Sequence, residues 1–143
     1  MSSYLADVNI WLALLVHEHE HHDATLHWFR SVAAGDVALC RLVQLSTIRL
    51  MGNADATRGK TVPALQAWAA FQHLCNDERV EFLNEPEGLD AILPTLFRYR
   101  VPTPGLVNDA YLAAFAMASR RCLVTYDRGF QQFRGLEVEI MGD

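Results

Sequence analysis

Three aspartates of this 143-residue sequence stand at the ends of predicted secondary-structure elements. Asp7 follows a short apolar run at residues 4–6, and Asp127 lies just beyond a second apolar run at residues 122–125. Asp109 begins an alanine-rich segment. Carboxylates without a partner lysine or cysteine–histidine pair suit hard divalent cations such as Mg²⁺ and Mn²⁺, which commonly act on phosphate esters. These residue types therefore indicate a metal site for phosphate chemistry.

The segment around Asp109 predicts a helix followed by a strand. Small and apolar residues recur at helical spacing through residues 109–120, and Asn108 stands where an N-cap belongs. Asp109 then falls in the first turn, where the helix dipole favours an anion. The continuous apolar run at 122–125 predicts a strand buried on both faces. Because carboxyl ends of parallel strands lie on one edge of a sheet, the three aspartates are expected to converge there.

Strands and helices alternate through the rest of the chain. After a strand at 4–6, helices are predicted at 8–15, 22–34, 42–51, 61–75 and 88–99, and further strands at 37–40, 80–83 and 137–140. Gly35 is expected to stop the second helix, Thr61 to cap the fourth, and Pro94 to kink or split the fifth. This order predicts one α/β domain over residues 1–143, with a mostly parallel central sheet flanked by helices.

Composition limits the class of protein. Hydrophobic residues make up 51% and charged residues 20%, as in a globular domain. No apolar run reaches the length of a membrane span, and the first residues lack the basic region of a secretory signal. The three cysteines are odd in number and lie in apolar surroundings. They indicate reduced core thiols, so a cytoplasmic protein is expected.

The charge of the chain leaves nucleic-acid binding open. A net charge of −5 argues against coating nucleic acid by bulk charge. However, eleven of the twelve basic residues are arginines, which suit bidentate contacts to phosphate. Divalent cations at the aspartates would also neutralise part of the acidity.

A zinc-peptidase motif occurs literally at His17, Glu18 and His21. The H-E-x-x-H pattern needs one helix to bring both histidines together, as well as a third ligand downstream. Here it falls where one predicted helix ends and the next begins. We interpret it as a polar loop that leads into a helix.

Other phosphate chemistries lack their residues. A phosphotransfer aspartate of the haloacid-dehalogenase kind needs a second aspartate where this chain has Asn9, and a late lysine, whereas Lys60 is the only lysine. A glycine-rich turn after the first strand and a G-x-S-x-G elbow are both absent. Each aspartate alone could also be a helix cap or turn residue, so the hypothesis rests on the coincidence of three.

The sequence resembles PIN-domain ribonucleases, in particular the VapC-type toxins of bacterial toxin–antitoxin pairs. The matching stretches are 5–9 (LADVN), 21–24 (HHDA) with Trp28, Gln44 with Arg49 and Leu50, 108–114 (NDAYLAA) and 125–130 (TYDRGF). The resemblance implies a Mg²⁺- or Mn²⁺-dependent endoribonuclease that a cognate antitoxin protein inhibits and that forms homodimers. It assigns the acidic metal-site roles to Asp7, Asp109 and Asp127, and a supporting role to Asn9.

One position departs from the family pattern. Most PIN nucleases have a glutamate where this chain has Ser46, and Gln44 and Arg49 are its polar neighbours. We expect weaker metal binding, with one ion well held before RNA adds its own oxygens. Arg49 is a candidate phosphate contact or an ordinary surface arginine. The missing glutamate motivates an alternative, a weak or inactive module that binds RNA or an antitoxin; a phosphatase or DNase at the same site is a third possibility.

Overall fold

A five-stranded sheet forms the centre of the computed structural model, which describes residues 3–98 and 100–142. The strands are β1 (Tyr4–Ala6), β2 (Val37–Leu39), β3 (Val80–Phe82), β4 (Cys122–Thr125) and β5 (Val138–Ile140), in the spatial order β3-β2-β1-β4-β5. Every pairing between these strands is parallel. The predicted α/β class is confirmed, and the sheet is parallel throughout its described strands.

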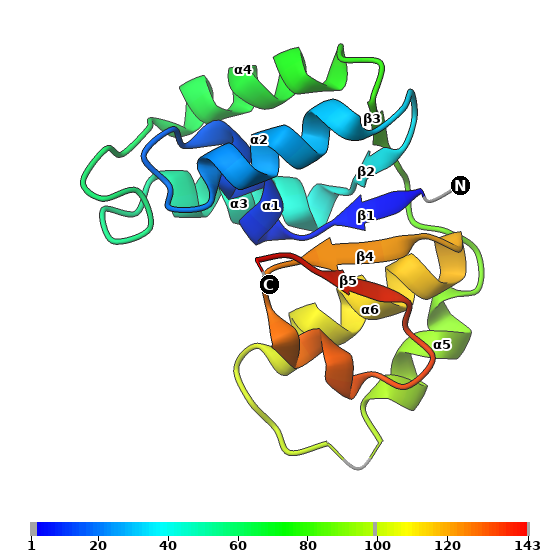
Figure 1. Cartoon of the computed structure of the whole chain (residues 1–143). Helices are drawn as coiled ribbons and strands as arrows, with labels where there is room; N and C mark the ends of the chain where they lie inside the picture. Colours follow the sequence, from blue (N-terminus) through cyan, green and yellow to red (C-terminus); the bar gives the residue numbers. More distant parts are fainter. Residues whose placement is uncertain (1–2, 99, 143) are drawn as a thin grey trace.

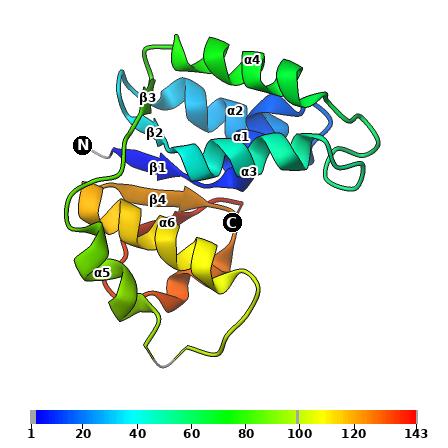
Figure 2. The same cartoon turned by 180° about the vertical axis from the view of Figure 1, so that it is seen from behind.

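Helices cover both faces of this sheet. They are α1 (Val8–Leu15), α2 (His22–Ser31), α3 (Arg41–Met51), α4 (Ala64–Cys75), α5 (Leu89–Leu96) and α6 (Leu106–Ser119), with a 3₁₀ turn η1 (Arg128–Gln132). Both views place α1–α4 on one side and α5, α6 and η1 on the other (Figures 1 and 2). Right-handed crossovers require this division, because the chain steps outward from β1 to β3 and then returns past β1 to β4.

The inner strands carry the core. Leu5 and Leu123 are fully buried and lie opposite each other in the register of β1 and β4. Against this apolar sheet, α6 presents a run of small residues with no exposed surface: Ala110, Ala113, Ala114 and Ala116. Small side chains let α6 approach the sheet closely, which places Asp109 near the strand ends. Burial of each large apolar side chain contributes about 1.5–3 kcal/mol.

Several predicted helix ends are wrong. The helix α6 begins one turn earlier than expected, after Gly105, so Asn108 is inside its first turn and does not cap it; Asp109 is in the first turn as predicted. The helix α2 ends at Ser31, before Ala34, because the Asp36 carboxylate accepts a hydrogen bond from Ala33 N (2.8 Å) and closes a turn there. Gly35 belongs to that turn, with φ of +73°.

Prolines explain two further differences. Pro63 precedes the first residue of α4 with an extended ψ of 144°, so the helix begins after it and Thr61 does not cap it. Pro94 lies inside α5, which continues to Leu96 and is not split in two. The predicted last residue of that helix, Tyr99, lies outside the described residues. Over the described ranges, no helix is both long and apolar enough to cross a bilayer.

Candidate active site

The site lies where the order of the strands reverses. From β1 the chain builds outward to β2 and β3, and it then returns to place β4 on the other side of β1. In open parallel sheets, a crevice forms at the carboxyl ends of the strands at such a switch point. Asp7 directly follows β1 and Asp127 follows β4 by two residues, so both aspartates lie at this edge.

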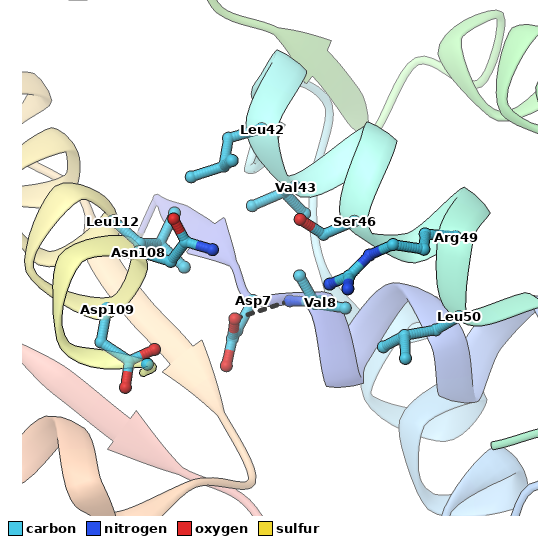
Figure 3. A pocket seen from close by; sticks show the side chains of 11 residues that line it. Asp7, Val8, Leu42, Val43, Ser46, Arg49, Leu50, Asn108, Asp109 and Leu112 are labelled. Carbon is cyan, nitrogen blue, oxygen red and sulfur yellow. Dashed lines mark hydrogen bonds between the residues drawn. The ribbon is translucent and has the colours of Figure 1, made fainter. Parts of the chain in front are cut away.

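Asp7 is fixed by two hydrogen bonds. One carboxylate oxygen accepts from Val8 N (2.7 Å) and caps α1, as Figure 3 shows, and the other accepts from Thr125 Oγ1 (2.8 Å). The side chain is 8% exposed. Burial raises the pKa of Asp7, the two hydrogen bonds oppose that effect, and the charge of Asp127 adds to it. Asp7 is therefore a helix cap and a candidate ligand at once.

Thr125 connects the polar groups of this edge. Its hydroxyl donates to Asp7 and accepts from Asn9 Nδ2 (3.2 Å) and from Asp127 N (3.0 Å). Asn9 in turn accepts from Tyr126 N (3.2 Å), which ties the start of α1 to the end of β4. The sequence indicated a supporting role for Asn9 but none for Thr125. The signals for Thr125 were its place in the matching stretch 125–130 and a hydroxyl at the last position of a buried strand.

Asp127 shapes the turn after β4. Its carboxylate accepts from Gly129 N (2.8 Å) and caps η1, while the side chain remains exposed. A Cβ at Gly129 would lie 3.0 Å from that carboxylate oxygen, so glycine is what allows the turn to close this tightly. Asp127 is therefore a turn residue, and this role is compatible with its predicted place in the site.

Asp109 lies on the first turn of α6, which packs on the side of the sheet opposite α1–α4 (Figures 1 and 2). Burial raises its pKa to about 6, and the negative charges of Asp7 and then Asp127 add to the shift. The three carboxylates are therefore close enough to repel one another. A carboxyl with a strongly raised pKa in a cleft is typical of a functional site.

A cavity of about 230 Å³ separates Asp7 and Asp109 from α3. Ser46 and Arg49 of α3 form its other wall, and the Arg49 guanidinium reaches over Val8 toward Asp7 (Figure 3). Gln44 is not among the residues that line this cavity. It is 1% exposed, and its side-chain oxygen accepts a hydrogen bond from Arg41.

The carboxylates of Asp7, Asp109 and Asp127 do not surround a single point. Within the described ranges, no group of three or more His, Cys, Asp or Glu side chains is gathered tightly enough to hold a metal ion. Asp7 and Asp109 share the cavity, whereas Asp127 lies outside its lining. The donor set nevertheless fits a hard divalent cation, since its oxygens are anionic and a cation would offset the repulsion that, after burial, raises the pKa of Asp109.

Comparison with known proteins decides the family. The PIN domain family matches residues 4–136. The chain belongs to the PIN-domain family. Within it, this PIN domain is a VapC-type ribonuclease. It is 37% identical to ribonuclease VapC41 of Mycobacterium tuberculosis over 142 residues, which cover 96% of this chain and 97% of the relative. It is 31% identical to ribonuclease VapC29 of the same species over 139 residues, with 92% and 90% coverage.

Solved structures show the same fold. VapC20 of Mycobacterium tuberculosis, described as a sarcin–ricin loop cleaving toxin, superposes with a TM-score of 0.68 at 20% identity, covering 96% of this chain and 99% of that one. A DNA-bound VapBC complex from Salmonella typhimurium gives a TM-score of 0.66 at 16% identity, with 98% of both chains covered. The PIN fold of this chain is thus shared with toxins and with toxin–antitoxin complexes.

The residue that departs from the PIN pattern lies inside the site. Ser46 lines the cavity with Asp7 and Asp109, so the glutamate that the resemblance led us to expect at this position would have added a carboxylate here. Its absence lowers the negative charge that faces a cation. The departure therefore concerns the candidate site and not the surrounding scaffold.

The histidine-rich segment forms a loop beside the site, as predicted. Residues 17–21 form turns and α2 begins at His22, so His17 and His21 do not share a helix. The rings of His17 and His22 stack at 4.7 Å, and His22 Nδ1 bonds to the carbonyl of Ala13 (2.7 Å). The imidazole of His21 stacks on Tyr126 at 4.1 Å. These contacts are those of a packed polar loop.

Proposed function

We propose that this PIN domain hydrolyses RNA phosphodiester bonds with Mg²⁺ or Mn²⁺ held by Asp7, Asp109 and Asp127. PIN-domain VapC ribonucleases are divalent-metal dependent as a class. The observation that supports the assignment of residues is the position of the three carboxylates at the switch-point edge, where the charges of Asp7 and Asp127 add to the raised pKa of Asp109. A cation bound there would lower the pKa of a bound water and offset charge on the scissile phosphate.

The residues of the chain have distinct parts in this proposal. Thr125 and Val8 N hold the Asp7 carboxylate in one orientation, so its position is set before RNA arrives. Asp109 has a pKa near 6 and is largely ionised at neutral pH, ready to bind a cation. Arg49 extends into the same cavity and is placed to contact a phosphate of the substrate.

We propose two protein partners, a cognate antitoxin and a second copy of this chain. Large apolar side chains on α3 and α4 support a protein interface, since Leu45 is 51% exposed, Leu65 81% and Trp68 37%. Phe71 of α4 is fully buried and belongs to the core. We also propose that the protein acts in the cytoplasm as one domain over residues 1–143, because its three cysteines are free thiols, as expected in a reducing compartment.

A second candidate function is a binding module without turnover. Ser46 in place of the family's glutamate and the open arrangement of the carboxylates favour it. Such a module would bind RNA or an antitoxin through the same cleft. The metal dependence of cleavage separates the two candidates.

The test is cleavage of a mixed RNA pool by the purified protein with Mg²⁺, with Mn²⁺ and with a chelator. The wild type should cleave only with metal, and Asp109→Asn should lower the rate by roughly a hundredfold or more, as removal of a catalytic electrostatic group does. Asp90→Asn is the matched control, because Asp90 is an exposed aspartate in the first turn of α5. Cleavage that survives in Asp109→Asn, or that needs no metal, would reject the proposal. No cleavage by the folded wild type would favour the binding module.

A further inference from the structure

The cleft beside the aspartates continues along α3. A second cavity of about 170 Å³ is lined by Arg41 at the start of α3, by Tyr111 and Phe115 of α6, and by residues 82–85, which end and follow β3. The next residue along each helix, Leu42 or Leu112, lines the first cavity, so α3 and α6 contribute to the walls of both. Both cavities are lined by residues of α3 and α6 and by residues at or just beyond the carboxyl end of a strand, β1 for the first cavity and β3 for the second.

Arg41 is held in a defined position in this second cavity. Its guanidinium lies over the rings of Phe82 (4.8 Å to the centroid) and Trp68 (5.5 Å), and it donates a hydrogen bond to the side-chain oxygen of Gln44. Cation–π contacts and a buried amide fix the arginine, so little side-chain freedom remains to be lost when it binds a ligand. This is also the role that the structure assigns to the buried amide of Gln44.

The charge of Arg41 is available to a ligand. Among residues 3–98 and 100–142, no carboxylate lies within ion-pair distance of it. Glu85 lines the same cavity, but its carboxylate accepts a hydrogen bond from the Tyr111 hydroxyl (2.8 Å). Arg41 is exposed, and Gln44 engages only one of its five N–H donors. A fixed arginine with free donors suits a phosphate group.

The spacing along α3 matches a strand of RNA. Arg49 lines the aspartate cavity and Arg41 the second one, eight residues apart and so about 12 Å along the helix axis. A stacked strand rises about 3.4 Å per nucleotide and crosses this distance in a few nucleotides. We propose that Arg41 is a phosphate-positioning residue, which holds the RNA backbone a few nucleotides from the scissile bond so that the strand lies along α3. This inference rests on the proposed function and adds the path of the substrate to it.

Salt dependence of RNA binding tests the contact without any need for cleavage. Labelled single-stranded RNA is titrated, without divalent metal, onto an Asp109→Asn parent and onto the same protein carrying Arg41→Gln. Loss of one phosphate contact should make the plot of log affinity against log salt shallower by about 0.7 and weaken binding roughly three- to tenfold at moderate salt. Arg134→Gln is the control, because this exposed arginine precedes β5 at the other edge of the sheet and its loss changes the net charge equally.

A second variant separates charge from packing. Arg41→Lys keeps a cation but loses the planar group that lies over the two rings, so it should keep most of the salt slope of the parent. Melting temperatures of all variants are measured beside the titrations. Two results would overturn the inference: an unchanged slope in Arg41→Gln, or an equal change in Arg134→Gln. A variant that binds RNA normally but fails to bind an acidic partner protein would show a protein site instead.

The results that would reject the proposed function differ from those that would reject only the RNA path along α3. If the parent binds no RNA and the wild type cleaves none, both proposals fall together. If the wild type cleaves RNA and the parent binds it with a slope that Arg41→Gln leaves unchanged, only the path along α3 is rejected.

Discussion

The two edges of the sheet treat charge in opposite ways. At the amino edge, Asp77 pairs with Arg79 at 2.7 Å, and this hydrogen-bonded partner lowers the pKa of Asp77 to about 2. At the carboxyl edge, burial and neighbouring carboxylates raise the pKa of Asp109 to about 6. The same residue type is thus stabilised as an anion at one edge and destabilised as an anion at the other.

Arg121 shows how completely the amino edge satisfies its polar groups. It precedes β4, and its guanidinium donates to the carbonyls of Tyr4, Gly35 and Asp36 (3.2–3.4 Å) and to the carboxylate of Glu81 (2.8 Å). One side chain therefore joins the starts of β1, β2 and β4 to β3. At the carboxyl edge, burial and the charges of Asp7 and Asp127 instead raise the pKa of Asp109. The difference indicates that the polar contacts of the amino edge stabilise the fold, whereas the repelling carboxylates of the carboxyl edge destabilise it and suit a cation.

The largest effect is expected from removing the bridge at the amino edge. Arg121→Met should lower the free energy of unfolding by roughly 2–4 kcal/mol, because it leaves three carbonyls and a carboxylate without their shared donor. Urea unfolding measures the change. Arg120→Met is the control, since Arg120 is the exposed neighbour that ends α6. The contrast between the edges would be wrong if both variants lost equal stability.

An intermediate effect, of opposite sign, is expected from Asp109→Asn. The folded state keeps a proton on Asp109 up to about pH 6, whereas the unfolded state releases it near pH 4. Protonation of Asp109 therefore stabilises the folded state at low pH, and this stabilisation is lost as the pH rises through 6. At neutral pH the ionised carboxylate therefore destabilises the folded state. The free energy of unfolding of the variant should be roughly 1–2 kcal/mol higher than that of the wild type, a value reduced because the Asp109 carboxylate is partly exposed. Thermal unfolding at pH 7.5 and at pH 4 measures the difference, which should vanish at the lower pH. A variant less stable than the wild type at pH 7.5 would contradict this account.

The smallest effect is expected from restoring the family's glutamate. Ser46→Glu places another carboxylate in the cavity with Asp7 and Asp109, and Mn²⁺ should bind several-fold tighter, about 1 kcal/mol. Calorimetric titration measures this affinity, and Ser46→Gln adds the same bulk without the charge. If the glutamine variant binds Mn²⁺ as tightly as the glutamate variant, charge is not what the site lacks.

The sequence predicted the elements that carry the site better than those around it. The bounds of β1, α1 and β4 agree with the structure, and each of these elements is a short and mostly apolar segment. The predicted caps Asn108 and Thr61 were wrong, since a helix can start at any of several adjacent residues and the preceding chain decides which.

The geometry of the site was predictable only in part. Parallel strands bring Asp7 and Asp127 to one edge whatever the loops do, and this follows from the pattern of elements. Two features depend on tertiary packing: the hydroxyl of Thr125 that joins the ends of β1 and β4, and the exclusion of Asp127 from the cavity. Single-residue patterns carry no signal for contacts between positions more than a hundred residues apart.

The pairing of β1 with β4 has a consequence during protein synthesis. Asp7 directly follows β1, but its partner Thr125 and the neighbouring Asp127 come more than a hundred residues later in the sequence. At about 5–20 residues per second, a ribosome needs roughly 6–24 s to extend the chain from one aspartate to the other. The nascent chain has no assembled site during this time, although it is attached to a ribosome and a messenger RNA. The order of the strands thus delays the assembly of this site until the ribosome has passed Asp127.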